Sequence, residues 1–106
     1  MAQIPPRVTE IVKRFIDELE KNHMPVKEAI LFGSYAAGTS NEWSDIDLAI
    51  VSDVFEGDRF RDRNKMRGIK LTISSDLEPL PFRSEDFKSE DPFIKKILET
   101  GVRMKG

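Results

Sequence analysis

The chain contains no cysteine among its 106 residues and only one histidine, His23. Disulfide bonds and thiolate metal sites are therefore excluded, as are zinc sites that need several histidines. Any bound metal must be held by oxygen atoms, which favours hard cations, Mg²⁺ above all and then Mn²⁺. His23 lies where a first helix should end, and we expect it to be solvated rather than to bind a ligand.

Long apolar runs are also missing. No run approaches the roughly 20 residues that cross a bilayer, and the N-terminus lacks the regions of a signal peptide. We therefore expect a cytoplasmic protein with no membrane partner. The net charge of −2 argues against binding nucleic acid over the whole surface, although a local basic patch could bind it. With 39% hydrophobic and 34% charged residues, the chain should form one soluble domain spanning residues 1–106.

Helices and strands are predicted to alternate along the chain. A stripe of apolar residues at helical spacing predicts a first helix over residues 6–21. Short apolar runs predict strands over residues 26–32 and 45–51, separated by a helical turn at 34–37 and a loop at 38–44.

The second half is expected to contain two helices and two short strands. A helix from about residue 57 should end near Gly68, and a strand over residues 75–79 should be terminated by Pro79 and Pro81. After a connecting turn, a helix over residues 93–100 should bury Ile94, Ile97 and Leu98, and an edge strand should follow at 102–104.

A phosphate site is predicted where the first strand ends. Gly33 permits close approach of the backbone, and the N–H groups at the start of the following turn lack intrahelical partners, so they can face an anion. The hydroxyl of Ser34 could bind phosphate or merely cap the turn.

A metal site is predicted at the start of the second strand. Asp45 and Asp47 lie two positions apart, so they share one face and lie about 6.6 Å apart along the strand. Because two like charges this close repel each other, a bound divalent cation is the simplest explanation for the pair. On the next strand Asp76 and Glu78 also share a face, and either could add a third carboxylate. We favour Glu78, which lies nearer the carboxyl end of its strand.

Two other features remain open to more than one interpretation. Trp43 is expected to pack beside the strand rather than to stack on a base. The basic run from Arg59 to Lys70 is expected to be a solvated helix face, with nucleotide phosphates, RNA or an acidic partner as the alternatives.

The segments Leu31-Phe32-Gly33-Ser34 and Ser44-Asp45-Ile46-Asp47-Leu48 resemble the signature of the DNA polymerase beta-like nucleotidyltransferase superfamily. The order of elements is similar to that of its minimal nucleotidyltransferase (MNT) domain family. The resemblance implies an α/β (α+β) fold in which helices pack against a small mixed sheet. It also implies a partner, since these domains are often encoded beside a helical HEPN protein in toxin–antitoxin pairs.

By this resemblance, Gly33 and Ser34 bind a nucleoside triphosphate, while Asp45, Asp47 and Glu78 are catalytic and bind Mg²⁺. Two such ions about 3.5–4 Å apart can activate an acceptor hydroxyl and stabilise the leaving pyrophosphate. Two positions depart from the family pattern. Many members carry arginine in place of Ala37, which removes a charge near the phosphates, and many carry aspartate in place of Glu78.

The leading hypothesis is thus a Mg²⁺-dependent enzyme that transfers a nucleoside monophosphate, AMP from ATP, to an acceptor hydroxyl on a HEPN-type partner toxin. We expect the chain to be too short to supply its own acceptor surface, so a partner or a homo-oligomer is expected. The alternative is a non-catalytic antitoxin subunit that neutralises a partner by contact through the basic run. A metal-dependent nuclease would also use clustered carboxylates, but it leaves the Gly-Ser turn unexplained.

Overall fold

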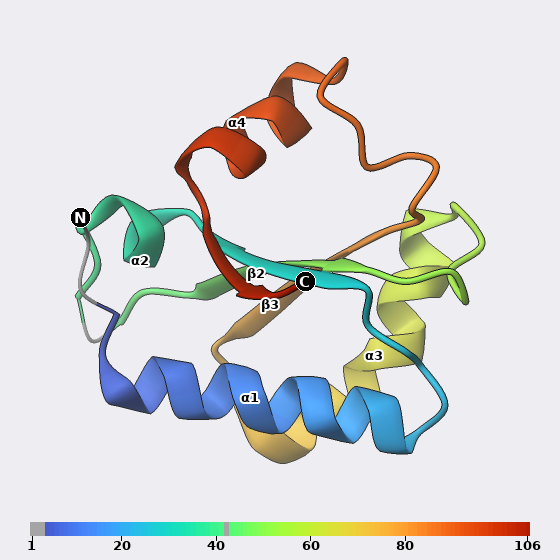
Figure 1. Ribbon diagram of the computed structural model, residues 1–106. Coiled ribbons are helices and arrows are strands. Elements are labelled where there is room, and N and C mark those ends of the chain that lie inside the picture. The colour runs from blue at the N-terminus through green and yellow to red at the C-terminus, as the bar shows by residue number, and fades with distance from the viewer. Residues whose placement is uncertain (1–3, 42) are drawn as a thin grey trace.

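The computed structural model describes residues 4–41 and 43–106, which form a four-stranded sheet with helices on both faces (Figure 1). The elements in chain order are α1 (Pro6–Lys21), β1 (Glu28–Phe32), α2 (Ser34–Ala37), β2 (Ile46–Val51), α3 (Arg59–Ile73), β3 (Leu77–Phe82), α4 (Pro92–Thr100) and β4 (Val102–Lys105). Among the described residues, no helix is long and apolar enough to cross a membrane.

The sheet has the strand order β3-β2-β1-β4 and is mixed, as predicted. β1 pairs antiparallel with both β2 and β4, whereas β2 pairs parallel with β3. Figure 1 shows α1 and α3 on one side of the sheet and α4 on the other. β2 is therefore an inner strand that is covered on both faces.

Two hydrophobic cores follow from this layering. Ile46, Leu48 and Ile50 of β2 enter the core beneath α1 and α3, as their alternation predicted. Ala49 and Val51 enter the second core, beneath α4. Since side chains alternate across a strand, Asp45 and Asp47 belong to the face of this second core.

Helix α3 is longer than predicted and continues past Gly68 to Ile73. Met66 is fully buried, and Ile69 and Ile73 pack against the first core. Packing of this stripe offsets the roughly 1 kcal/mol that a glycine costs inside a helix. The prediction that the helix ends near Gly68 was therefore wrong.

The third strand begins at Leu77 and runs through both prolines, so the prediction of a strand ended by them was wrong. The carbonyl oxygens of Asp76 and Phe82 accept hydrogen bonds from the N–H groups of Ile46, the first residue of β2, and of Ser52, which follows its last residue. Because alternate residues direct their backbone groups to opposite sides, Pro79 and Pro81 direct their nitrogens to the open edge. Proline is tolerated at such edge positions, where no N–H is needed.

The last two elements were predicted with small errors. The side chain of Asp91 accepts hydrogen bonds from the backbone of Phe93 and Ile94 and so caps α4. Ile94 and Ile97 are buried, but Leu98 is 36% exposed and lies at the margin of the stripe. β4 forms the predicted edge strand beside β1.

Candidate functional site

The glycine turn at the end of β1 touches the predicted metal site. Gly33 has φ 74° and ψ −148°, a backbone conformation that is essentially restricted to glycine. A Cβ atom added there would lie 2.2 Å from Asp47 Oδ2. Phe32 is the antiparallel register partner of Asp47, so pairing of β1 with β2 creates this contact. The predicted phosphate turn and the predicted metal ligand are thus neighbours in space.

Asp45 and Asp47 form the carboxylate pair at the start of β2. Asp45 is exposed, whereas Asp47 is half-buried. Neither side chain forms an ion pair or hydrogen bond with any residue in the described part of the chain. Burial raises the pKa of Asp47, and the nearby charges of Asp45 and Glu78 raise it further. Residues 4–41 and 43–106 therefore supply no counterion for this pair.

Glu78 is the parallel register partner of Asp47, which places the two residues side by side on one face of the sheet. Its carboxylate nevertheless pairs with two cations of α3, Arg63 at 3.4 Å and Lys70 at 3.7 Å. Asp76 lies in the turn before β3 and pairs with Arg7 of α1 at 3.9 Å. Strand register thus favours Glu78 over Asp76 as the neighbour of Asp47.

The carboxylate oxygens of Asp45, Asp47 and Glu78 suit a hard cation, but the Glu78 side chain is held in ion pairs with α3. Within residues 4–41 and 43–106, no group of three or more histidine or acidic side chains is arranged to hold a metal. The two aspartates have no counterion among the residues that the structure describes, and burial of Asp47 disfavours its charged form, so a divalent cation would relieve both effects. Glu78 could join them only if its ion pairs with Arg63 and Lys70 opened.

Trp43 does not pack beside the strand, contrary to expectation, because its side chain is 82% exposed. Two hydrogen bonds of Asn41 account for the exposed position of Trp43. Its side-chain oxygen accepts a hydrogen bond from the backbone of Trp43, and its own N–H donates to the hydroxyl of Ser44. This local turn satisfies the loop backbone without burying the indole.

Arg7 at the start of α1 connects two segments that flank the sheet. Its guanidinium donates a hydrogen bond to the hydroxyl of Tyr35 in α2, at 3.2 Å. The same guanidinium pairs with Asp76, and Tyr35 belongs to the first core, so Arg7 ties α1 to α2 and to the turn before β3. The sequence pattern does not single out Arg7, because it lies at the start of a helix that carries many charged residues.

The geometry joins a strand–glycine turn to two carboxylates at the start of the next strand. The sequence profile of the nucleotidyltransferase domain family matches residues 12–102. The chain belongs to the nucleotidyltransferase domain family. A Methanocaldococcus jannaschii protein, MJ0604, is named as a candidate protein adenylyltransferase and is 48% identical over 44 residues. This match covers 41% of the present chain and 44% of that protein, less than half of its length.

Two solved structures share the fold of this nucleotidyltransferase domain. One is a candidate nucleotidyltransferase from Sulfolobus solfataricus, with a TM-score of 0.64, 21% identity, and coverage of 92% of this chain and 78% of that one. The other is a toxin–antitoxin structure with AMP-PNP, with a TM-score of 0.61, 20% identity, and coverage of 92% and 73%. At these identities the likeness concerns the fold alone.

Proposed function

We propose that this domain transfers a nucleoside monophosphate, AMP from ATP, to a hydroxyl group on a partner protein, with Mg²⁺ as its metal. One observation carries the proposal: the glycine-only turn at Gly33 lies against Asp47, and Asp47 and Asp45 have no counterion within the described residues. Phosphates at the turn and a cation on the carboxylates would therefore lie next to each other.

Each group would have a distinct role in the transfer. Gly33 and Ser34 would bind the triphosphate, and Asp45 and Asp47 would hold the metal. Bound metal supplies activation of the attacking hydroxyl and stabilisation of the leaving oxygen. The acceptor oxygen would form a bond to the α-phosphorus while the bond to pyrophosphate breaks. Glu78, once released from its ion pairs, would accept the proton of the hydroxyl.

The comparisons support adenylyl transfer to a protein in a toxin–antitoxin setting. The relative from M. jannaschii is named for protein adenylylation, and the structure with AMP-PNP is titled a toxin–antitoxin. The sequence resemblance adds the kind of partner, and we propose a helical HEPN-type toxin as the acceptor.

The test is transfer of label from ATP to such a partner in the presence of Mg²⁺. The wild-type chain should label the partner, whereas Asp45→Asn and Asp47→Asn should reduce labelling by about 10³-fold or more. Asp53→Asn is the matched control, because Asp53 lies just beyond the other end of β2 and pairs with Lys27 on the surface. It should retain transfer.

Equal labelling by wild type and Asp47→Asn would contradict the proposal. If no chain transfers label while the variants still neutralise the toxin, the domain acts instead as a subunit that neutralises by contact.

A further inference from the structure

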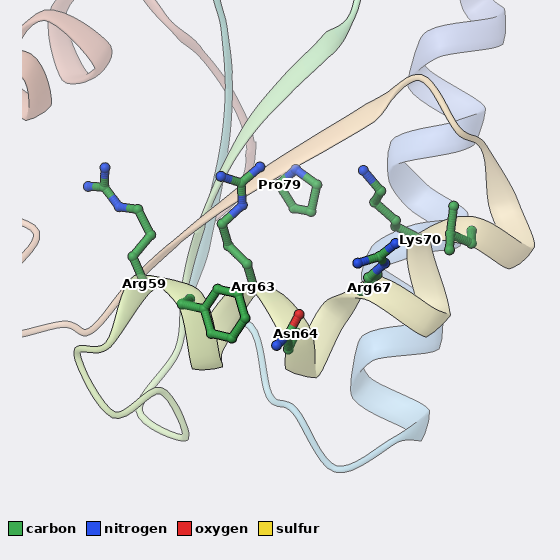
Figure 2. A pocket seen from close by; sticks show the side chains of 8 residues that line it. Arg59, Arg63, Asn64, Arg67, Lys70 and Pro79 are labelled. Carbon is green, nitrogen blue, oxygen red and sulfur yellow. The ribbon is translucent and has the colours of Figure 1, made fainter.

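A groove of about 550 Å³ lies along α3, beside the edge strand β3. Four cations line it: Arg59, Arg63, Arg67 and Lys70. They recur every three or four positions, so they occupy one face of the helix and span about 16 Å along its axis. Figure 2 shows the side chains of Arg59, Arg63 and Lys70 extending from α3 on the side of Pro79. The basic run is therefore a largely solvated helix face, as expected, and its cations form one continuous stripe along the groove.

The charge of this stripe is only partly balanced by the chain. Arg63 and Lys70 share the carboxylate of Glu78. Arg59 and Arg67 form no ion pair with any residue of the described ranges. The pairing with Glu78 shows that a carboxylate fits against these cations. The four cations face this one carboxylate, so three positive charges are left unbalanced by the described residues.

Two exposed apolar side chains lie with the cations along the groove. Phe60 is 75% exposed and Leu71 is 55% exposed, and neither contributes to the two cores. They lie near opposite ends of α3, eleven positions apart. Burial of large exposed side chains of this kind is a common source of affinity at protein interfaces.

The groove is poorly suited to two other kinds of occupant. Pro79 and Pro81 remove the backbone donors from the open edge of β3, so an added strand could not form a regular ladder there. A nucleic-acid strand would find one exposed ring, that of Phe60, but the second apolar side chain of the groove, Leu71, offers no ring on which a base could stack.

We propose that the α3 groove binds an acidic amphipathic helix of a partner protein. Carboxylates at every third or fourth position of such a helix repeat at the same pitch as the cations of α3. Apolar residues near its two ends would cover Phe60 and Leu71, in the manner of other helices that bind in grooves.

Docking would also act on Glu78. Carboxylates of the partner compete with Glu78 for Arg63 and Lys70, and its release leaves it free beside its register partner Asp47. This consequence rests on the proposed function, whereas docking itself does not. Binding is therefore measured without ATP or metal, so that a failure of transfer and a failure of docking are distinguishable.

The experiment measures fluorescence anisotropy of a labelled peptide helix of about 14 residues. The peptide carries glutamate at every third or fourth position and leucine near each end, and it is titrated with the full chain. We expect saturable binding that weakens with salt. The double variant R59A/R67A should bind roughly tenfold more weakly. Lys95→Ala on α4, an exposed cation on the other face of the sheet, should leave binding unchanged.

Glu78→Gln provides the sharper arm of the test. It removes the internal competitor for Arg63 and Lys70, so the peptide should bind roughly threefold more tightly to this variant. Circular dichroism spectra identical to that of the wild type establish that each variant is folded. No binding by the wild type, equal binding by R59A/R67A, or weaker binding by Glu78→Gln would overturn the proposal. Tighter binding of a uridine oligonucleotide of equal charge would assign the groove to RNA and overturn it too.

Discussion

Glu78 neighbours two clusters of like charge, the acidic pair on β2 and the basic stripe on α3. The two clusters differ in how far their charge destabilises the folded protein. Asp45 and Asp47 form a small negative cluster in which one carboxylate is half-buried and neither has a counterion in the described chain. The positive stripe on α3 is larger, but most of it faces water. An unneutralised charge is costly when it is buried and inexpensive when it is solvated. The acidic pair therefore indicates a ligand that would relieve it, whereas the basic stripe indicates a surface that other molecules can use.

The largest expected effect on stability comes from breaking the contact between the glycine turn and the acidic pair. Gly33→Ala forces a Cβ atom against Asp47 and a side chain into a glycine-only conformation. The backbone strain alone should cost about 1–3 kcal/mol of stability. Transfer of label should fall by roughly 100-fold or more, because the reacting groups are displaced.

Gly68→Ala is the matched control for this change. A Cβ atom at Gly68 meets nothing within 4 Å, and the residue lies inside α3. Alanine should therefore raise stability there by up to about 1 kcal/mol. Urea unfolding measures both changes, and destabilisation of equal size at the two glycines would contradict the account.

A pair of Asp→Asn variants sharpens the comparison, because one should lower the stability of the protein and the other should raise it. Asp62 is buried and accepts hydrogen bonds from the backbone of Glu56 and Gly57 and from Lys65. Asn cannot accept all of them, so Asp62→Asn should cost about 1–3 kcal/mol. Asp47→Asn should instead raise the melting temperature in EDTA, because it removes a half-buried charge that Asp45 and Glu78 oppose.

The pH dependence of this second effect follows from the raised pKa of Asp47. When the pKa of a carboxyl group is higher in the folded than in the unfolded state, the folded protein becomes less stable as pH rises through the folded-state pKa. The advantage of Asp47→Asn should thus be complete at neutral pH and should shrink as pH falls toward the ordinary pKa of aspartate. Thermal melts across this range in EDTA measure it, and an advantage that grows on acidification would have the wrong sign.

The smallest effect is expected at the exposed groove. Phe60→Ser should change the free energy of unfolding by no more than about 0.5 kcal/mol, because the ring is 75% exposed. The same variant should still weaken binding of the acidic peptide. A large loss of stability would show that Phe60 serves the fold and not the surface.

The sequence predicted the β1–α2–β2 region well because its signals are local. Gly33 marks the turn, and alternation along β2 assigns Asp47 and Leu48 to opposite faces. Strand register then places Glu78 beside Asp47, a relation that follows once β3 lies next to β2.

The α3–β3 region was predicted less well because tertiary packing overrides its local signals. Gly68 and Pro79 are ordinary stop signals, yet packing of Ile73 against the first core and the open edge of the sheet allow these elements to continue. The ion pairs of Glu78 and the exposure of Trp43 depend on side-chain contacts that spacing alone does not encode.

Calorimetric titration of ATP into the chain, with Mg²⁺ and with EDTA, tests the central claim most directly. The claim is that the turn at Gly33 and the carboxylate pair form one site for a nucleotide and its metal. The wild type should bind ATP more tightly with Mg²⁺ than with EDTA, and Asp47→Asn should lose that difference. Equal affinity in EDTA, or a Mg²⁺ effect that survives in Asp47→Asn, would contradict the account.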